Sequence, residues 1–551
     1  MFFGGLLALG WAVVPDYGSF GDEESCRESG QYSLQYVAEL LPPSWLPARA
    51  VARLREHPPG TSRLANYADR DYGVAFELPL TVIEQLTVPS TDLGAVLRLR
   101  HRAVFLVCFG GLLAFYWLAR ARFGSWRLAL LAALLLVLSP RQLADAFYNC
   151  KDGVFMAAQL VATATMVAFV RRPTPARAAW CALAGALAIN VRIMAVLGPV
   201  LTLSLVGLRW WADAYAGQRP GRALATYAAL LPVLTVAFWP YLWAAPLTRF
   251  TQTFASMAHF RWHGLVLFDG RLVDSYQLPW QYAPTWMLLT TPLLYVAGLG
   301  LAAAAAGWRM VRDWRDWRGG SGWPVWRGWR TALAAPINPA WQDLLLWGLG
   351  LGPLLAVVGL RSVLYDGWRQ LYFVYPPLLL LALGGLRAAW QAAGRWQLLA
   401  SRAKWVVKAG RGALLLIVLL GLAEPARQLV RLHPFQHLYF NALAGAHPEQ
   451  RYEYDYWALS LRPALAWIAA HDARADIRVR PDNPFTRAAI LDQALLPAAA
   501  RARLFIERDS ARANYFVTTY RFHPQPYPGF GPPVYTLRVE GRRVLDIFQL
   551  K

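Results

Sequence analysis

The sequence lacks the short motifs with which many soluble enzymes bind nucleotides, metals or acyl substrates. No Walker A loop, His-Glu-x-x-His pair, Gly-x-Gly-x-x-Gly turn or Gly-x-Ser-x-Gly elbow occurs in its 551 residues. These absences exclude a P-loop NTPase, a zincin-type protease, a Rossmann enzyme and an α/β-hydrolase. No internal repeat is visible, so the inverted symmetry of many secondary transporters finds no support in the sequence.

Acidic residues are scarce: 33 Asp and Glu stand against 55 Lys and Arg, which gives a net charge of +22. A basic chain of this kind suggests nucleic-acid binding. The arginines, however, gather in short linkers between apolar runs, and many of the 26 tryptophans lie beside them. That pattern is typical of the positive-inside bias and the aromatic belt of a membrane protein, so we expect a lipid bilayer and no nucleic acid as partner.

Long apolar runs are abundant, with 56% apolar residues and a mean hydropathy of +0.29. A membrane span needs about 20 residues of apolar helix. We therefore predict a polytopic α-helical membrane protein with about eleven spans. They lie near residues 2–14, 103–119, 126–138, 153–170, 178–190, 193–208, 223–243, 285–306, 342–360, 369–386 and 412–423.

The first run, residues 2–14, is unusual because it would cover only about 20 Å of the roughly 30 Å hydrocarbon core. No small-residue cleavage site follows it, so we do not interpret it as a cleavable signal peptide. Two explanations remain open: residues that precede it are missing, or this helix is tucked among the others.

Charge also predicts the topology. Alternate linkers between the apolar runs carry 21 Lys and Arg against three acidic residues, while nearly all other acids lie in the second set of loops. The bias predicts the N-terminus inside, a long first outer loop at residues 15–102 with juxtamembrane helices, and an extracytoplasmic C-terminal α/β domain at 424–551. In this interpretation residues 1–423 form the transmembrane domain. A turn at Glu540-Gly541 is predicted to join the last two strands of the C-terminal domain.

Two acidic turns stand beside apolar runs on the predicted outer face. The first is Gly21-Asp22-Glu23-Glu24 and the second is Tyr148-Asn149-Cys150-Lys151-Asp152. Carboxylates at a bilayer surface are costly unless they are solvated, paired or used in chemistry. Most short acidic runs are solvated loops, but the placement of these two on one face predicts the halves of an active site.

Several stretches together resemble the GT-C superfamily of polytopic membrane glycosyltransferases, in a family-39-like branch. That group includes protein O-mannosyltransferases and bacterial lipid A aminoarabinose and galacturonic acid transferases. Besides the acidic turns, the resemblance rests on Ser139-Pro140-Arg141, Leu364-Tyr365-Asp366-Gly367-Trp368-Arg369, the run from His433 to Asn441, and Tyr454-Asp455-Tyr456-Trp457. It covers nearly the whole chain, and it departs at Cys150, where proline is expected.

The resemblance and the chemistry of sugar transfer assign roles to the acidic residues. Inverting transfer needs a carboxylate that accepts the proton of the attacking hydroxyl. Asp22 is the predicted base. Glu23 is its rival, or else it orients the acceptor or raises the pKa of the base. Asp152 either caps the following helix or supports catalysis by holding Lys151 or a metal.

Cationic and histidine side chains are assigned to binding. Lys151, Arg369 and Arg192 are the predicted partners of a donor phosphate, although arginines near span ends also simply snorkel to the interface. His259 and His263 are predicted to line the acceptor or sugar pocket. Since no third ligand stands at motif spacing, no cofactor is assigned and a divalent metal is left open.

Two of the four cysteines, Cys26 and Cys150, lie in the predicted outer loops close to the two acidic turns. An oxidising compartment would permit a bridge between them. We therefore predict that they approach within disulfide range and tie the first outer loop to the second.

The favoured function is a hexosyl- or pentosyltransferase of the bacterial inner membrane, acting in cell envelope glycosylation. It would move a sugar from a polyprenyl-phosphate carrier to a hydroxyl of a glycan, lipid or protein on the outer face. The alternatives are a transporter or flippase of lipid-linked sugars, or a non-catalytic assembly subunit. A transporter or flippase needs neither a paired-carboxylate loop nor a folded outer domain.

Overall fold

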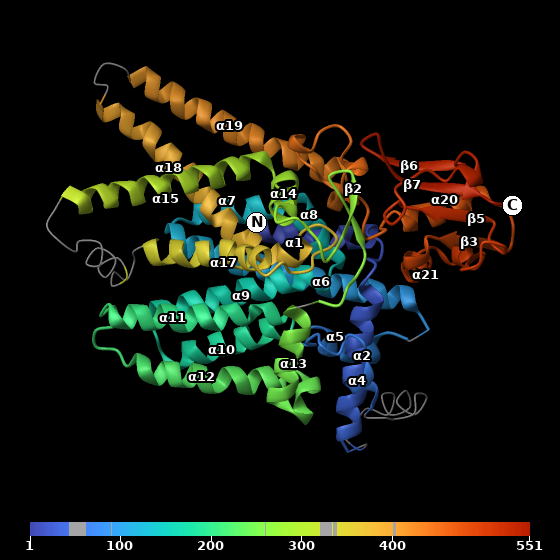
Figure 1. Cartoon of the computed structure of the whole chain (residues 1–551), viewed down its shortest axis with the longest axis horizontal. Helices are drawn as coiled ribbons and strands as arrows, with labels where there is room; N and C mark the ends of the chain where they lie inside the picture. Colours follow the sequence, from blue (N-terminus) through green and yellow to red (C-terminus); the bar gives the residue numbers. More distant parts are fainter. Residues whose placement is uncertain are drawn as a thin grey trace.

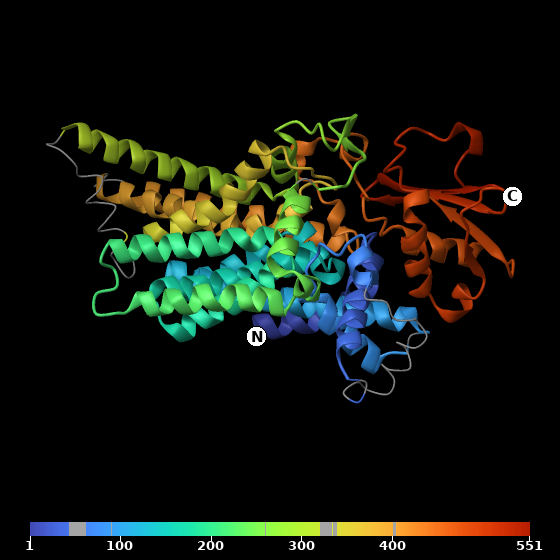
Figure 2. The same cartoon turned by 60° about the horizontal axis from the view of Figure 1, so that its bottom comes forward.

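Long helices run side by side along the long axis of the molecule, and a small sheet-containing domain lies at one end of the bundle (Figures 1 and 2). This is a computed structural model. It describes residues 1–42, 44, 62–89, 91–258, 260–319, 333, 339–399 and 404–551. The predicted class, a helical membrane protein with a small C-terminal α/β domain, is confirmed.

Eight helical segments among the described residues are long and apolar enough to cross a membrane. They are α6 (Leu93–Phe123), α9 (Asp152–Arg171), η3 with α11 (Ile193–Val196 and Leu197–Trp211), α12 (Pro220–Ala237), α15 (Leu293–Gly319), α17 (Pro339–Gly359), η5 with α18 (Arg369–Val374 and Tyr375–Leu399) and α19 (Lys404–Arg431).

Three further apolar segments account for the rest of the predicted spans. Helices α7 (Trp126–Val137) and α8 (Pro140–Tyr148) form a pair bent by 74°, and α1 (Phe2–Val13) and α10 (Pro175–Ile189) are shorter. Each of the eleven apolar runs thus falls mainly on helix, while the number that cross a membrane stays a prediction.

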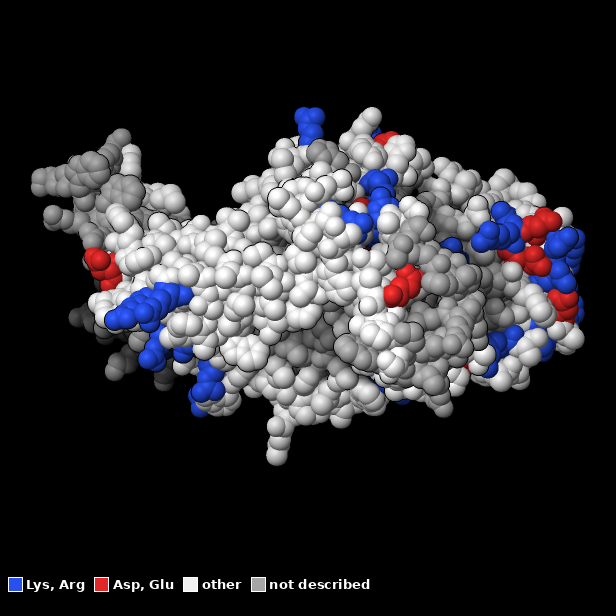
Figure 3. All heavy atoms as spheres, turned by 90° about the horizontal axis from the view of Figure 1, so that it is seen from below, with Lys and Arg blue, Asp and Glu red and all other residues white. Residues whose placement is uncertain are grey.

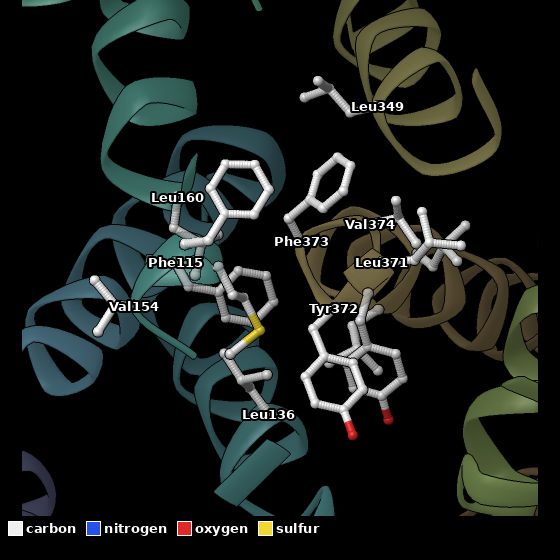
Figure 4. Close-up of a cluster of buried hydrophobic side chains, with 14 of the residues drawn as sticks. Phe115, Leu136, Val154, Leu160, Leu349, Leu371, Tyr372, Phe373 and Val374 are labelled. Carbon is white, nitrogen blue, oxygen red and sulfur yellow. The ribbon is translucent and has the colours of Figure 1, made fainter. Parts of the chain in front are cut away.

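The surface agrees with a membrane setting. Seen from below, much of the flank of the helices is uncharged, and charged side chains lie at the two ends of the molecule and in a smaller group between this flank and the sheet domain (Figure 3). Apolar side chains from α6, α7, α9, α17 and η5 also fill the interior between the helices (Figure 4). This segregation is what a bilayer requires, because lipid-facing charge is costly.

The basic linkers share the end of the bundle opposite the sheet domain. Arg171 pairs with the carbonyl of Ala121, and the hydroxyl of Tyr215 donates to the carbonyl of Val170 at 2.6 Å, so three linkers adjoin. The C-terminal ends of α15 and α18 lie at that same end (Figure 1). The predicted alternation of linkers is therefore present, and which end faces the cytoplasm stays a prediction.

Helices α15 and α18 approach each other closely because glycine lies at their contact. A Cβ built on Gly385 would lie 2.1 Å from the carbonyl oxygen of Gly298 and 2.5 Å from the backbone nitrogen of Ala302. Small residues at such crossings let helix backbones pack directly, which is a common basis of association in membranes.

The predicted first outer loop contains α2 (Glu23–Leu40), α4 (Ser62–Asn66) and α5 (Glu77–Thr87). Helix α6 begins at Leu93, ten residues before the predicted span, so the last ten residues of the predicted loop are helical. Asp92 caps α6 by accepting from the backbone N–H of Ala95 at 3.0 Å. Arg100, in the first turns of α6, is buried against Glu77 and Glu84.

The next long outer segment, residues 244–284, holds a hairpin that the sequence analysis missed. The segment begins at the end of η4 (Pro240–Ala244) and ends at the start of α14 (Tyr282–Thr290). Between them lie α13 (Pro246–Ala258) and the antiparallel strands β1 (Leu265–Phe268) and β2 (Arg271–Asp274). Asp269 and Gly270 both have positive φ, at 52° and 77°, so the Asp-Gly signal of a two-residue hairpin was present in the sequence.

The C-terminal domain is a mixed five-stranded sheet of order β4-β3-β5-β7-β6, with helices packed on it. Its elements are α20 (Leu461–His471), β3 (Ile477–Pro481), α21 (Thr486–Ala494), α22 (Ala498–Arg501), β4 (Leu504–Ile506), β5 (Tyr515–Thr518), β6 (Tyr535–Val539) and β7 (Arg542–Gln549). The predicted Glu540-Gly541 hairpin is confirmed, with φ of 51° and 78°. The predicted domain start at 424 falls inside α19.

Short 3-10 turns join the bundle to this domain and complete its loops. They are η1 (Val14–Asp16), η6 (Gln436–Leu438), η7 (Ala442–Ala444), η8 (Pro448–Gln450), η9 (Asn483–Phe485) and η10 (Pro528–Phe530).

Candidate active site

The two acidic turns predicted from the sequence meet at the end of the bundle that faces the sheet domain. Asp22 directly precedes α2, and Lys151 directly precedes α9. The ammonium nitrogen of Lys151 lies 3.8 Å from a carboxylate oxygen of Asp22 and 3.5 Å from the hydroxyl of Ser25. The same ammonium nitrogen lies over the ring of Tyr72, 4.8 Å from the ring centre.

Asp152 holds two arginines in this turn. The side-chain oxygen of Asn149 accepts from the backbone N–H groups of Lys151 and Asp152, at 3.1 and 2.8 Å, which fixes the start of α9. The two carboxylate oxygens of Asp152 pair with Arg192 and, at 2.9 Å, with Arg369. The structure therefore gives Asp152 arginine partners, where the sequence analysis expected Lys151 or a metal.

Arg369 is the centre of the cluster and is enclosed by it. Its guanidinium group lies 3.4 Å from Asp22 and 2.9 Å from Asp366, in addition to Asp152. Aromatic rings of Trp457 and Tyr365 cover it at 4.4 and 4.8 Å. Only 1% of the side chain is exposed, against 34% for Asp22, so Asp22 rather than Arg369 faces the outside.

Three residues of the cluster were not predicted as site residues: Asp366, Glu453 and Arg521. Arg521, from the loop after β5, pairs with Asp366, donates to the carbonyl of Tyr456 at 3.1 Å and lies 3.6 Å from Glu453. Asp366 stands inside a motif quoted above and Glu453 stands next to one. No pattern in the sequence singles out Arg521.

Electrostatics keep Asp22 ionised. Burial alone raises the pKa of this carboxyl, but the positive charges of Lys151, Arg369, Arg521 and Arg192 outweigh it and lower the pKa below its usual value. Burial alone lowers the pKa of Lys151, and the negative charge of Asp22 leads the interactions that raise it well above its usual value. Both groups are therefore charged at neutral pH.

Glu453 behaves differently, because burial dominates and raises the pKa of its carboxyl to about 8. Neutral Glu453 leaves three carboxylates, Asp22, Asp152 and Asp366, to face four cations. The cations are Lys151, Arg192, Arg369 and Arg521. Among the described residues the cluster thus has one excess positive charge, and the side chains of Lys151 and Arg192 are partly exposed.

The structure does not bring every predicted residue into the cluster. Glu23 is buried and contacts His101 at 3.1 Å, away from Asp22. His263 is 68% exposed and contacts Asp274 at 2.9 Å. The neighbouring Trp262 instead stacks on Tyr365 at 4.3 Å and thereby reaches the edge of the cluster. His259 lies outside the described residues.

The open question of a metal has one candidate set of ligands in the described part of the chain. Sulfur atoms of Cys26 and Cys150 and a carboxylate oxygen of Glu77 lie within 4.8 Å of one another. The Asp22 cluster itself is a poor metal site, because Asp152 and Asp366 already share their oxygens with arginines.

No family model and no curated protein match the chain. Among solved structures it is similar to ArnT from Cupriavidus metallidurans bound to undecaprenyl phosphate, with 16% identity over 99% of this chain and 97% of that one and a TM-score of 0.47. The apo state of ArnT gives a TM-score of 0.45 at the same identity and coverage. Arabinofuranosyltransferase AftD from Mycobacteria gives 0.35 at 16% identity, covering 87% of this chain and 37% of that one. The functional conclusion below rests on the geometry of the site.

Proposed function

We propose that the protein transfers a sugar from a polyprenyl-phosphate carrier to a hydroxyl group of a glycan, lipid or protein. The observation that carries this proposal is a partly exposed, ionised carboxylate, Asp22, set between Lys151 and Arg369 at the end of an apolar bundle. A base beside cations suits a reaction in which a hydroxyl gains nucleophilicity and an anionic phosphate departs.

Asp22 is the base in this reaction. The acceptor hydroxyl donates its proton to the Asp22 carboxylate while its oxygen attacks the anomeric carbon of the sugar. The bond between that carbon and the phosphate oxygen breaks, and the electron pair leaves with the lipid phosphate. A single displacement of this kind inverts the anomeric configuration.

Lys151 and Arg192 are the phosphate ligands with exposed charge. Their side chains are 15% and 12% exposed, whereas Arg369 is enclosed by Asp152, Asp366 and two aromatic rings. Arg369 therefore acts on the phosphate at longer range, and its main task is to hold Asp22 and Asp152 in position. The excess positive charge of the cluster compensates the charge of the bound phosphate.

Donor binding prepares the base for its task. In the free site the neighbouring cations lower the pKa of Asp22 and make it a weak base. A bound phosphate adds negative charge close to Asp22, which raises the pKa of the carboxyl toward the range of an effective proton acceptor. The base therefore becomes stronger only when the leaving group is present.

The apolar bundle supports a donor that enters laterally from the bilayer, and this agrees with the absence of a nucleotide-binding motif. In this proposal the protein resides in the bacterial inner membrane with the sheet domain extracytoplasmic. A flippase of lipid-linked sugars needs no base at such a position. Labelling of the sheet domain from outside intact cells tests the orientation. If the domain were protected from the label, the opposite orientation would follow.

Asp22→Asn is the first test of the proposed reaction. The substitution keeps size and hydrogen bonding but removes the proton acceptor, so transfer in reconstituted vesicles should fall about 10²–10⁴-fold. Binding of the lipid phosphate, measured separately, should change far less, since Lys151 and Arg192 remain. The fold, followed by thermal unfolding in detergent, should be unaffected.

Glu23→Gln is the matched control, since Glu23 is adjacent in sequence but contacts His101. Its transfer rate per folded molecule should stay near that of the wild type. Normal transfer by Asp22→Asn, with Glu23→Gln inactive though folded, would assign the base to Glu23. Normal transfer by both variants would show that neither carboxylate is the base.

A further inference from the structure

Two cysteines from distant parts of the chain lie together behind the candidate active site. Cys26 is in the first turn of α2, where its backbone N–H donates to the carbonyl of Asp22 at 3.1 Å. Cys150 is in the turn between α8 and α9, next to Lys151. The two side chains are buried, at 2% and 6% exposure, and their sulfur atoms lie within 4.8 Å.

Glu77 is the third member of this cluster, and its surroundings disfavour a metal ion. One of its carboxylate oxygens pairs with Arg100, whose buried guanidinium group also contacts Glu84 at 3.4 Å. A divalent cation would therefore sit beside a buried positive charge. Structural zinc sites, moreover, take four protein ligands, and the described cluster supplies three.

We propose that Cys26 and Cys150 are joined by a disulfide bond in the mature protein. The structure contains both as free thiols, and the proposal is that oxidation links them. The bond would tie the residue one helical turn after Asp22 to the residue directly before Lys151. It would thus link covalently the two acidic turns, in which the ammonium nitrogen of Lys151 lies 3.8 Å from a carboxylate oxygen of Asp22.

The chemistry is thiol–disulfide exchange with a dithiol–disulfide oxidant of the extracytoplasmic compartment. The thiolate of one cysteine attacks the disulfide of the oxidant and expels one of its sulfurs as thiolate. The second cysteine then attacks the mixed disulfide and expels the other sulfur. The chain loses two electrons and two protons, and the oxidant gains them as two thiols. Because both sulfurs are buried in the final fold, the exchange belongs to folding, before α2 packs against α5.

Peptide mapping of the full-length protein tests this directly. Cells are lysed in denaturant that contains a maleimide, so that buried free thiols are also blocked, and the purified protein is digested with trypsin without reductant. The sequence places Cys26 in tryptic peptide 1–27 and Cys150 in peptide 142–151. We expect the two peptides linked, with a mass two hydrogens below their sum, and released by a reductant. Reduction of the intact protein should lower its thermal midpoint by on the order of 5 °C.

Two variants serve as controls. Cys26→Ser should leave peptide 142–151 unlinked and carrying maleimide, while Cys181→Ser, which removes a buried thiol of α10, should leave the link intact. Maleimide on both Cys26 and Cys150 in the wild-type chain would overturn the proposal, and so would one zinc ion per chain released by thiol modification. The proposal rests on the extracytoplasmic orientation given under the proposed function, but none of these readouts uses sugar transfer, so the disulfide and the transfer reaction can fail separately.

Discussion

At Glu453, desolvation by the surrounding protein sets the protonation state, because the side chain is buried behind the exposed face of the site. One carboxylate oxygen accepts from the backbone N–H of Asp366 at 3.1 Å, and the other lies 3.6 Å from Arg521. Burial raises the pKa of this carboxyl to about 8. A protonated Glu453 preserves the excess positive charge of the cluster, which the proposed function assigns to binding of the donor phosphate.

The pH dependence of donor binding should report this residue. Below pH 8 Glu453 is neutral and the cluster is positive; above pH 8 it ionises and cancels that charge. The KM for the lipid-phosphate donor should therefore rise on the order of tenfold between pH 7 and pH 9 in the wild type. In Glu453→Gln, which stays neutral, the KM should be flat across this range. An equal rise in both proteins would assign the titration to another group.

At the scale of elements, the close contact of α15 with α18 depends on the missing Cβ atoms of Gly298 and Gly385. Gly385→Ala should force the two backbones apart, because the new carbon would lie 2.1 Å from the Gly298 carbonyl oxygen. Overpacking of this kind costs about 1–3 kcal/mol. Thermal unfolding of the purified variant in detergent should show a lower midpoint than the wild type.

Gly384→Ala is the matched control for this prediction. The position is adjacent in the same helix, but no atom lies within 4 Å of a Cβ built there. Its midpoint should be unchanged or slightly higher, since alanine favours helix over glycine. Equal loss of stability in the two variants would mean that helix propensity, and not the close approach of α15, decides the effect.

At the scale of the whole molecule, the sheet domain contributes Arg521 to the candidate active site. The side chain of Arg521 extends from the sheet domain, is buried against Asp366 and is the fourth cation of the cluster. Arg521→Gln should remove the excess positive charge and leave Asp366 with Arg369 alone. Sugar transfer in reconstituted vesicles should fall at least about tenfold, with a higher KM for the donor.

Arg487→Gln provides the comparison, because Arg487 also links the sheet domain to α2 but lies outside the cluster. It contacts Glu24 and Glu28 at 3.3 and 3.8 Å and is 57% exposed, so its loss should be nearly neutral. If the two variants lost activity equally, Arg521 would matter only for the position of the domain.

The sequence by itself determined the helices and turns whose conformation depends on residues close together in the chain. Apolar runs long enough to cross a bilayer became helices because their backbone groups are satisfied within the run. The Glu540-Gly541 turn closed a hairpin because both residues tolerate positive φ. The meeting of the two acidic turns was also predictable, since strict alternation of basic and acidic linkers leaves both at one end of the bundle.

Only the tertiary structure decided which side chains of those turns face each other. Glu23, the first residue of α2, contacts His101, while Asp22, which precedes the helix, lies beside Lys151, and no local pattern contains this choice. Long-range packing also enclosed Arg369 and brought in Arg521, which is 155 residues from its partner Asp366. Such contacts depend on how the whole chain buries its apolar surface, whereas the sequence pattern reports only what happens within a few turns.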